Sequence, residues 1–146
     1  MKNRIILILI TFLIILSISI YYVYNYRRQA IEAQKINNEY KSYYNMQMLG
    51  TELISILNKT ADINEKNEIP KDSKDMYIDN NENSIKIYVN LKYKEEFQTV
   101  EMEKILNNGI EKFIKPYVAA SFKCTEIRYH DKTKNVKELV FTETDD

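Results

Sequence analysis

The stretch 5–24, IILILITFLIILSISIYYVY, constrains this chain more than any other part of it, because it contains no charge, no glycine and no proline. An α-helix rises about 1.5 Å per residue, so a helix of this length covers the roughly 30 Å hydrocarbon core of a bilayer. Each Leu, Ile, Phe or Val near the centre favours insertion by about 0.3 to 0.6 kcal/mol. The sequence therefore predicts that residues 1–26 form a basic lead-in and a transmembrane helix.

The flanks of this apolar run bear on cleavage and orientation. The run is longer than the 7–15 residues typical of a signal-peptide core and no Ala-x-Ala site follows it, so we expect an uncleaved anchor. Lys2 and Arg4 precede the run and Arg27 and Arg28 follow it, so the positive-inside rule favours neither orientation clearly. A short tail before such a span usually stays in the cytoplasm. We therefore expect a single-pass protein of the cell membrane with an extracytoplasmic C-terminal domain.

Residues 27–62 continue the helical pattern with an amphipathic character. Apolar residues recur there at spacings close to 3.6, namely Ile31, Ile36, Tyr40, Tyr43, Met46, Leu49, Leu53, Leu57 and Ala61. The pattern predicts one helix that continues from the membrane. Gly50 is its weak point, costing up to about 1 kcal/mol relative to alanine, and marks either a bend or a close approach of another backbone.

The apolar stripe of this helix has two possible partners. Packing against the chain's own domain is the better explanation for the stripe as a whole. Its membrane-proximal part, however, has no obvious cover elsewhere in the chain. We therefore predict that Ile31, Ile36, Tyr40 and Tyr43 form a face for contact with copies of the chain or with other proteins.

The sequence pattern of residues 63–146 predicts a small α+β domain. The segment 84–93, SIKIYVNLKY, alternates apolar and polar residues, as a strand covered on one face does. Apolar spacing predicts a second helix over 100–115, ended by Pro116. Segments 122–130 and 136–143 are rich in β-branched and aromatic residues and predict a hairpin joined by a polar loop. The predicted fold is thus a long N-terminal helix packed on a small antiparallel sheet with a second helix.

Residues suited to catalysis or metal binding are sparse. His130 is the single histidine, expected at a solvent-facing strand end, and Cys124 is the single cysteine, expected to be a buried strand residue. Paired acids occur only as neighbours, at 95–96 and 145–146, and neighbouring strand residues point to opposite faces. We predict no catalytic residue, no cofactor and no metal site, and hence that the protein is not an enzyme.

Two further classes of ligand are disfavoured. Asp72, Asp75, Asp79 and Glu82 lack the spacing of a calcium-binding loop and predict a solvated acidic loop instead. Basic and acidic residues are equal in number, 21 each, so no broad basic surface for nucleic acid is expected.

An apolar and then amphipathic N-terminal helix followed by a small sheet-bearing domain resembles the layout of type IV pilins, pseudopilins and small single-pass proteins of Tad-type pilus machinery. Their processing signal, a glycine before the apolar run and a glutamate within it, is absent: Arg4 stands at the glycine position and the run has no glutamate. The resemblance implies an accessory or minor pilin-like protein of the envelope. The stretches GTELISILNKTADINEKN and FKCTEIRYH also resemble small membrane proteins of Gram-positive bacteria.

Two functions remain open from the sequence. The first is a pilin-like structural or assembly protein that works through contact of its helix with protein partners or with copies of itself. The second is a membrane-anchored module that binds a small ligand or a peptide. A deep, partly apolar pocket with converging polar groups would favour the second.

Overall fold

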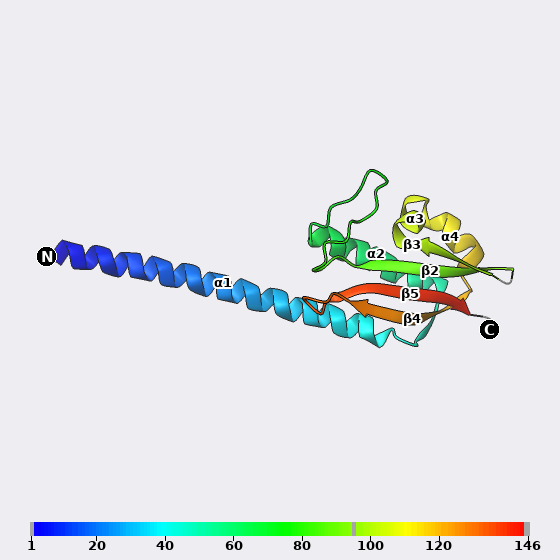
Figure 1. Cartoon of the computed structure of the whole chain (residues 1–146), viewed down its shortest axis with the longest axis horizontal. Coiled ribbons are helices and arrows are strands. Elements are labelled where there is room, and N and C mark those ends of the chain that lie inside the picture. The colour runs from blue at the N-terminus through cyan, green and yellow to red at the C-terminus, as the bar shows by residue number, and fades with distance from the viewer. Residues whose placement is uncertain (1, 95, 145–146) are drawn as a thin grey trace. The chain divides into compact units, whose positions relative to one another are not determined.

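The computed structural model of the protein describes residues 2–94 and 96–144. The chain divides into two compact units, Met1–Ile36 and Asn37–Asp146. Its elements are α1 (Lys2–Ser42), β1 (Gln47–Leu49), α2 (Gly50–Lys66), β2 (Lys86–Tyr93), β3 (Glu96–Glu101), α3 (Met102–Asn107), α4 (Ile110–Tyr117), β4 (Ser121–Tyr129) and β5 (Val136–Thr144). The α+β class predicted from the sequence is confirmed (Figure 1).

The first unit consists of helix α1 up to Ile36. Its apolar side chains between residues 5 and 24 are exposed all round the helix. The hydroxyls of Thr11, Ser17 and Ser19 donate to the carbonyls four residues earlier, so they present no unsatisfied donor to an apolar medium. The helix is long and apolar enough to cross a membrane once.

The second unit is built on a five-stranded sheet in the order β1-β4-β5-β2-β3. Its central strands β4, β5 and β2 lie side by side in Figure 1. Strands β4 and β5 form the predicted hairpin, pairing Ser121 with Thr144 at one end and Tyr129 with Val136 at the other. The short strand β1 extends the β4 edge, and β3 forms the opposite edge.

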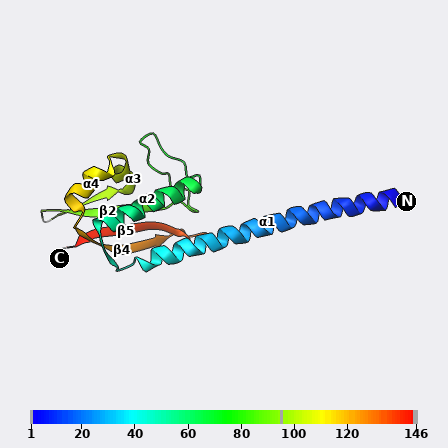
Figure 2. The same cartoon turned by 180° about the vertical axis from the view of Figure 1, so that it is seen from behind.

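Helix α2 covers one face of the sheet. In Figure 2, which shows the molecule turned by 180°, α2 lies in front of the strands. Helix α2 contacts β1, β2 and β4, and α3 and α4 contact α2 beside them. The buried apolar residues of this layer include Leu53, Leu57, Ile87, Val89, Met102, Phe122, Leu139 and Phe141. Leu53 and Leu57 of the predicted apolar stripe and residues of the predicted strand at 84–93 therefore belong to the core.

The sheet is mixed, which corrects the prediction of an antiparallel one. Strand β5 is antiparallel to β4 but parallel to β2, with Ile87 opposite Leu139. Alternation in β2 indicates that one face is covered. It does not report the direction of the neighbouring strand, which depends on the connection through β3, α3, α4 and β4.

The prediction of one helix continuing from the membrane through residues 27–62 was wrong, because α1 ends at Ser42 and α2 begins at Gly50. Asn45 adopts a left-handed φ of 61° between them, and its N–H donates to the Cys124 carbonyl at 2.9 Å. Residues 47–49 thus pair with β4 as a strand, although the apolar residues on both sides of them keep a helical spacing. At Gly50 the expected close approach occurs: an added Cβ would lie 2.0 Å from the Tyr117 carbonyl oxygen.

The predicted helix over 100–115 is also corrected. Its first two residues belong to β3, and the remainder is split into α3 and α4 at Gly109, whose φ is 92°. Glycine adopts this conformation without the cost that a side chain would bring. Pro116 lies inside the last turn of α4, and the helix ends one residue later.

Candidate functional site

The four residues of the predicted contact face fall into different environments. Ile31 is 68% exposed, Ile36 and Tyr43 are half-buried, and Tyr40 is 1% exposed. Tyr40 therefore belongs to the interior of the second unit and does not offer a surface to a partner. Ile31 remains fully available for contact.

The two tyrosines are fixed by different hydrogen bonds. The Tyr40 hydroxyl lies 2.7 Å from the Thr60 hydroxyl of α2, and burial raises the pKa of Tyr40 above its ordinary value. The Tyr43 hydroxyl donates to Glu39 at 2.8 Å, and partial burial together with this carboxylate raises the pKa of Tyr43 to about 12. Glu39 also pairs with Lys59 of α2. The last turns of α1 are thus joined to α2 by one hydrogen bond between hydroxyls and by one ion pair.

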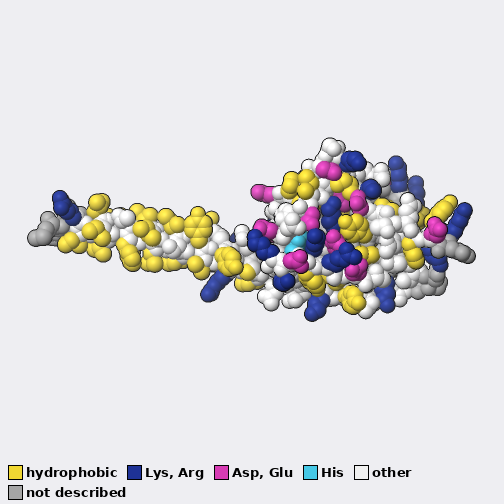
Figure 3. Space-filling model, in the orientation of Figure 1, with side chains coloured by type: hydrophobic (Ala, Val, Ile, Leu, Met, Phe, Trp, Pro, Cys, Tyr) yellow, Lys and Arg dark blue, Asp and Glu magenta, His cyan; other side chains and the backbone are white. Residues whose placement is uncertain are grey.

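An open groove of about 720 Å³ lies between the end of α1 and the β4–β5 turn. Its lining residues are Asn37, Asn38, Lys41, Arg128, Tyr129, His130, Asp131 and Lys134. We call this surface the α1–turn groove. Figure 3 shows that the visible face of the second unit mixes basic and acidic side chains with scattered hydrophobic ones. Each of the eight lining residues bears a polar or charged group.

Asn37 fixes one wall of the α1–turn groove. Its side-chain amide donates to the Lys134 carbonyl at 3.1 Å, and its amide oxygen accepts the Val136 N–H at 2.7 Å. The turn is closed on itself by the His130 N–H, which donates to the Asn135 carbonyl at 2.9 Å. The turn therefore has a defined shape although it lies at the surface.

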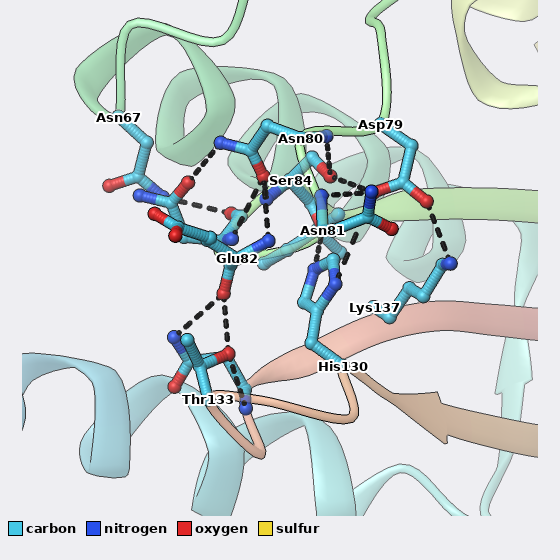
Figure 4. Close-up of polar contacts among 12 residues, drawn as sticks. Asn67, Asp79, Asn80, Asn81, Glu82, Ser84, His130, Thr133 and Lys137 are labelled. Atoms are coloured by element: carbon cyan, nitrogen blue, oxygen red, sulfur yellow. Dashed lines mark hydrogen bonds and ion pairs between the residues drawn. The ribbon is translucent and has the colours of Figure 1, made fainter.

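The loop 79–84 holds the same turn from the other side, as Figure 4 shows. Thr133 donates its hydroxyl to the Glu82 carbonyl at 2.6 Å, and Lys132 pairs with the Glu82 carboxylate at 3.0 Å. Within the loop, the Asn80 amide oxygen accepts backbone N–H groups of residues 82, 83 and 84. Two loops distant in the sequence are thereby joined into one hydrogen-bonded structure.

His130 is buried, at 2% exposed, which corrects the prediction of a solvent-facing residue. Its Nε2 lies 2.8 Å from the Ser84 carbonyl, and a carbonyl only accepts, so Nε2 carries the proton. Its Nδ1 lies 4.0 Å from Asp79 Oδ1, and in Figure 4 the ring points into the loop. The histidine thus fastens the hairpin to the loop.

Several polar groups of this loop and of β5 contact the carboxylate of Asp79. Burial alone would raise its pKa, but hydrogen bonds from Lys137, the Asn81 N–H and Ser84 lower the pKa of Asp79 to about 2. Lys137 Nζ lies 2.7 Å from the second carboxylate oxygen. Asp79 is therefore a structural anion, and its role was not visible in the sequence, where it appeared as one acid of a polar loop.

Glu103 is a second buried acid, at 2% exposed. One carboxylate oxygen accepts the Tyr77 N–H at 3.2 Å and lies 3.5 Å from Lys86 Nζ. The other oxygen has no hydrogen-bond partner among the described residues. The contacts of Glu103 hold the loop before β2 against α3, and the carboxylate is too enclosed to meet a ligand.

The remaining candidates have no arrangement for chemistry. Cys124 is buried on β4 as predicted, and burial raises the pKa of its thiol to about 11, so the thiol stays protonated. Within 2–94 and 96–144, no three His, Cys, Asp or Glu side chains gather as metal ligands would. Of the paired acids, residues 95 and 145–146 lie outside the described residues.

Comparison with protein-family models gives no match. Searches of curated proteins and of solved structures give no match either.

Proposed function

We propose that this chain is a single-pass, pilin-like structural or assembly protein of the cell envelope, which acts by protein–protein contact and not as an enzyme. The observation that carries this proposal is the exposure of the whole apolar run 5–24 in the protein's own fold. An exposed apolar surface of this size requires lipid or another chain to cover it. A membrane anchor supplies that cover.

The segment after the span supports a role in contact. Ile31 is exposed, and Arg27, Arg28 and Lys35 are exposed around it. Cations beside a span are attracted to anionic headgroups, whereas the exposed Ile31 has apolar surface that a partner can cover. We place this contact on α1 between the span and Asn37, with the second unit on the extracytoplasmic side.

A small-molecule module is less well supported. Such sites are usually concave, largely apolar and enclosing. The α1–turn groove is open, and the residues that line it and the smaller hollow near Asn80 and Lys132 are of polar and charged types. Neither has the converging polar groups around an apolar pocket that the binding-module hypothesis requires.

The contact role can be tested by chemical crosslinking in intact membranes. We expect Ile31→Glu to reduce crosslinked species, because a charge on the contact face must be desolvated when a partner packs there. Phe97→Glu is a matched control, since Phe97 is a similarly exposed apolar residue on β3, 55% exposed. Equal crosslinking by both variants and the unmodified chain would contradict the proposal.

A further inference from the structure

The α1–turn groove carries cationic and neutral donors that the fold leaves without acceptors. The side chains of Asn38, Lys41, Tyr129 and Lys134 make no hydrogen bond or ion pair with any described residue. Arg128 differs, because it pairs with Glu126 at 2.7 Å and with Glu138 at 3.0 Å. The available donors therefore come from both walls, Lys41 from α1 and Lys134 from the turn.

The charge of the groove is unbalanced. Its lining holds three cations, Lys41, Arg128 and Lys134, and one carboxylate, Asp131. Because Arg128 is already paired with Glu126 and Glu138, the excess consists of the two lysines against Asp131. Complementary charge selects partners and accelerates their association more than it adds affinity. A carboxylate-bearing ligand matches the excess cations, whereas a basic one is repelled.

The walls of the groove are held in place before any ligand arrives. Asn37 fixes the turn with two hydrogen bonds, and Thr133 and Lys132 fix it to the loop 79–84. A site whose backbone is already ordered loses little conformational entropy on binding. Its open shape admits a chain that enters and leaves, as a polypeptide segment does.

From these features we propose that the α1–turn groove binds an acidic polypeptide segment of a partner protein. Carboxylates of that segment pair with Lys41 and Lys134, while Asn38 and the Tyr129 hydroxyl donate to its remaining acceptors. This inference rests on the proposed contact function and adds a second contact surface, separate from the one around Ile31, together with the chemistry of its ligand.

The test uses the full chain in uncharged maltoside micelles, with a fluorescently labelled octaglutamate peptide as the probe. We expect the double variant Lys41→Gln/Lys134→Gln to weaken binding at least fivefold by anisotropy. The control Lys112→Gln/Lys115→Gln removes the same charge from exposed residues of α4 and should change binding less than twofold. An octalysine peptide should show no saturable binding.

Equal loss in both double variants would overturn the proposal, because it would indicate attraction to net charge alone. Measurements in nanodiscs test whether the anion that binds the groove belongs to a lipid and not to a polypeptide. If phosphatidylglycerol shifts the amide resonances of Asn38 and Lys134 and octaglutamate does not, the groove is a lipid site and the proposal fails. Crosslinking at Ile31 is an independent measurement, so it can persist when the groove result is negative.

Discussion

The Tyr40 hydroxyl donates to the Thr60 hydroxyl at 2.7 Å and so joins the last turns of α1 to the middle of α2. The direction follows from Thr60, whose own proton is donated to the Ile56 carbonyl at 2.8 Å. Both side chains are buried. Tyr40, which the apolar spacing assigned to the predicted contact face, is therefore part of the interior of the second unit.

Tyr40→Phe is expected to lower the free energy of unfolding by about 1 kcal/mol, because one buried hydrogen bond is lost while Thr60 keeps its bond to Ile56. Urea unfolding in micelles, followed by circular dichroism, measures this change. Tyr43→Phe is the control, since Tyr43 is only half-buried and its loss should be smaller. Reduced crosslinking by Tyr40→Phe at unchanged stability would instead return Tyr40 to the contact face.

Gly50→Ala is expected to destabilise the second unit by at least about 2–3 kcal/mol. The new Cβ would lie 2.0 Å from the Tyr117 carbonyl oxygen, so backbone has to move. Gly109→Ala meets no atom within 4 Å and carries only the strain of φ at 92°, about 1–3 kcal/mol. Thermal melts of both variants rank the two effects, and a Gly50 variant as stable as the unmodified chain would refute the close approach.

Asn64→Ala is expected to cost about 2–4 kcal/mol. Asn64 accepts the Ile85 N–H at 2.9 Å and donates to the Ile85 carbonyl at 2.7 Å, in place of a neighbouring strand. Its removal leaves two buried backbone groups unsatisfied. Asn58→Ala, an exposed change on the same helix, should be nearly neutral. Similar urea midpoints for the two variants would show that the backbone of Ile85 finds other partners.

Asp79 is expected to make stability depend on pH between about 4 and 2. Because its folded-state pKa of about 2 lies below the ordinary value near 3.9, its contribution is present above pH 4 and lost as the pH falls toward 2. The side chain is 34% exposed, so solvent screening reduces the contribution to about 1 kcal/mol.

Urea midpoints at pH 4.5 and pH 2 measure this contribution in the unmodified chain and in Asp79→Asn. The variant should lose less stability on acidification, whereas Asp62→Asn, an exposed change on α2, should follow the unmodified chain. Parallel loss in Asp79→Asn would show that another acid carries the effect.

Much of the fold follows from local signals. Alternation located β2, and the polar loop 131–135 located the hairpin. The apolar spacing around Leu53 indicated helix there but not the break that makes α2 a separate helix. Strand β3 was missed because the turn before it uses Lys94 at φ 60° and not a glycine, so no turn signal marked it. Asn-Asn-Gly at 107–109 did mark the end of α3, but the apolar spacing on either side concealed it.

The candidate site was less predictable, because it depends on long-range contacts. Asn37 is separated from Lys134 and Val136 by almost the whole domain, and no local pattern connects them. The burial of His130 likewise depends on Ser84, far away in sequence. Lys41 and Lys134 resemble any surface lysines until the fold brings them to one groove.

The central claim is that the apolar run anchors this protein in a membrane. Extraction of the full chain from membranes with alkaline carbonate measures this directly, with Leu9→Asp/Leu13→Asp as a variant whose span is made polar. We expect the unmodified chain to stay in the membrane pellet and the variant to be released. Recovery of the unmodified chain as a monomer in the carbonate supernatant would contradict the account.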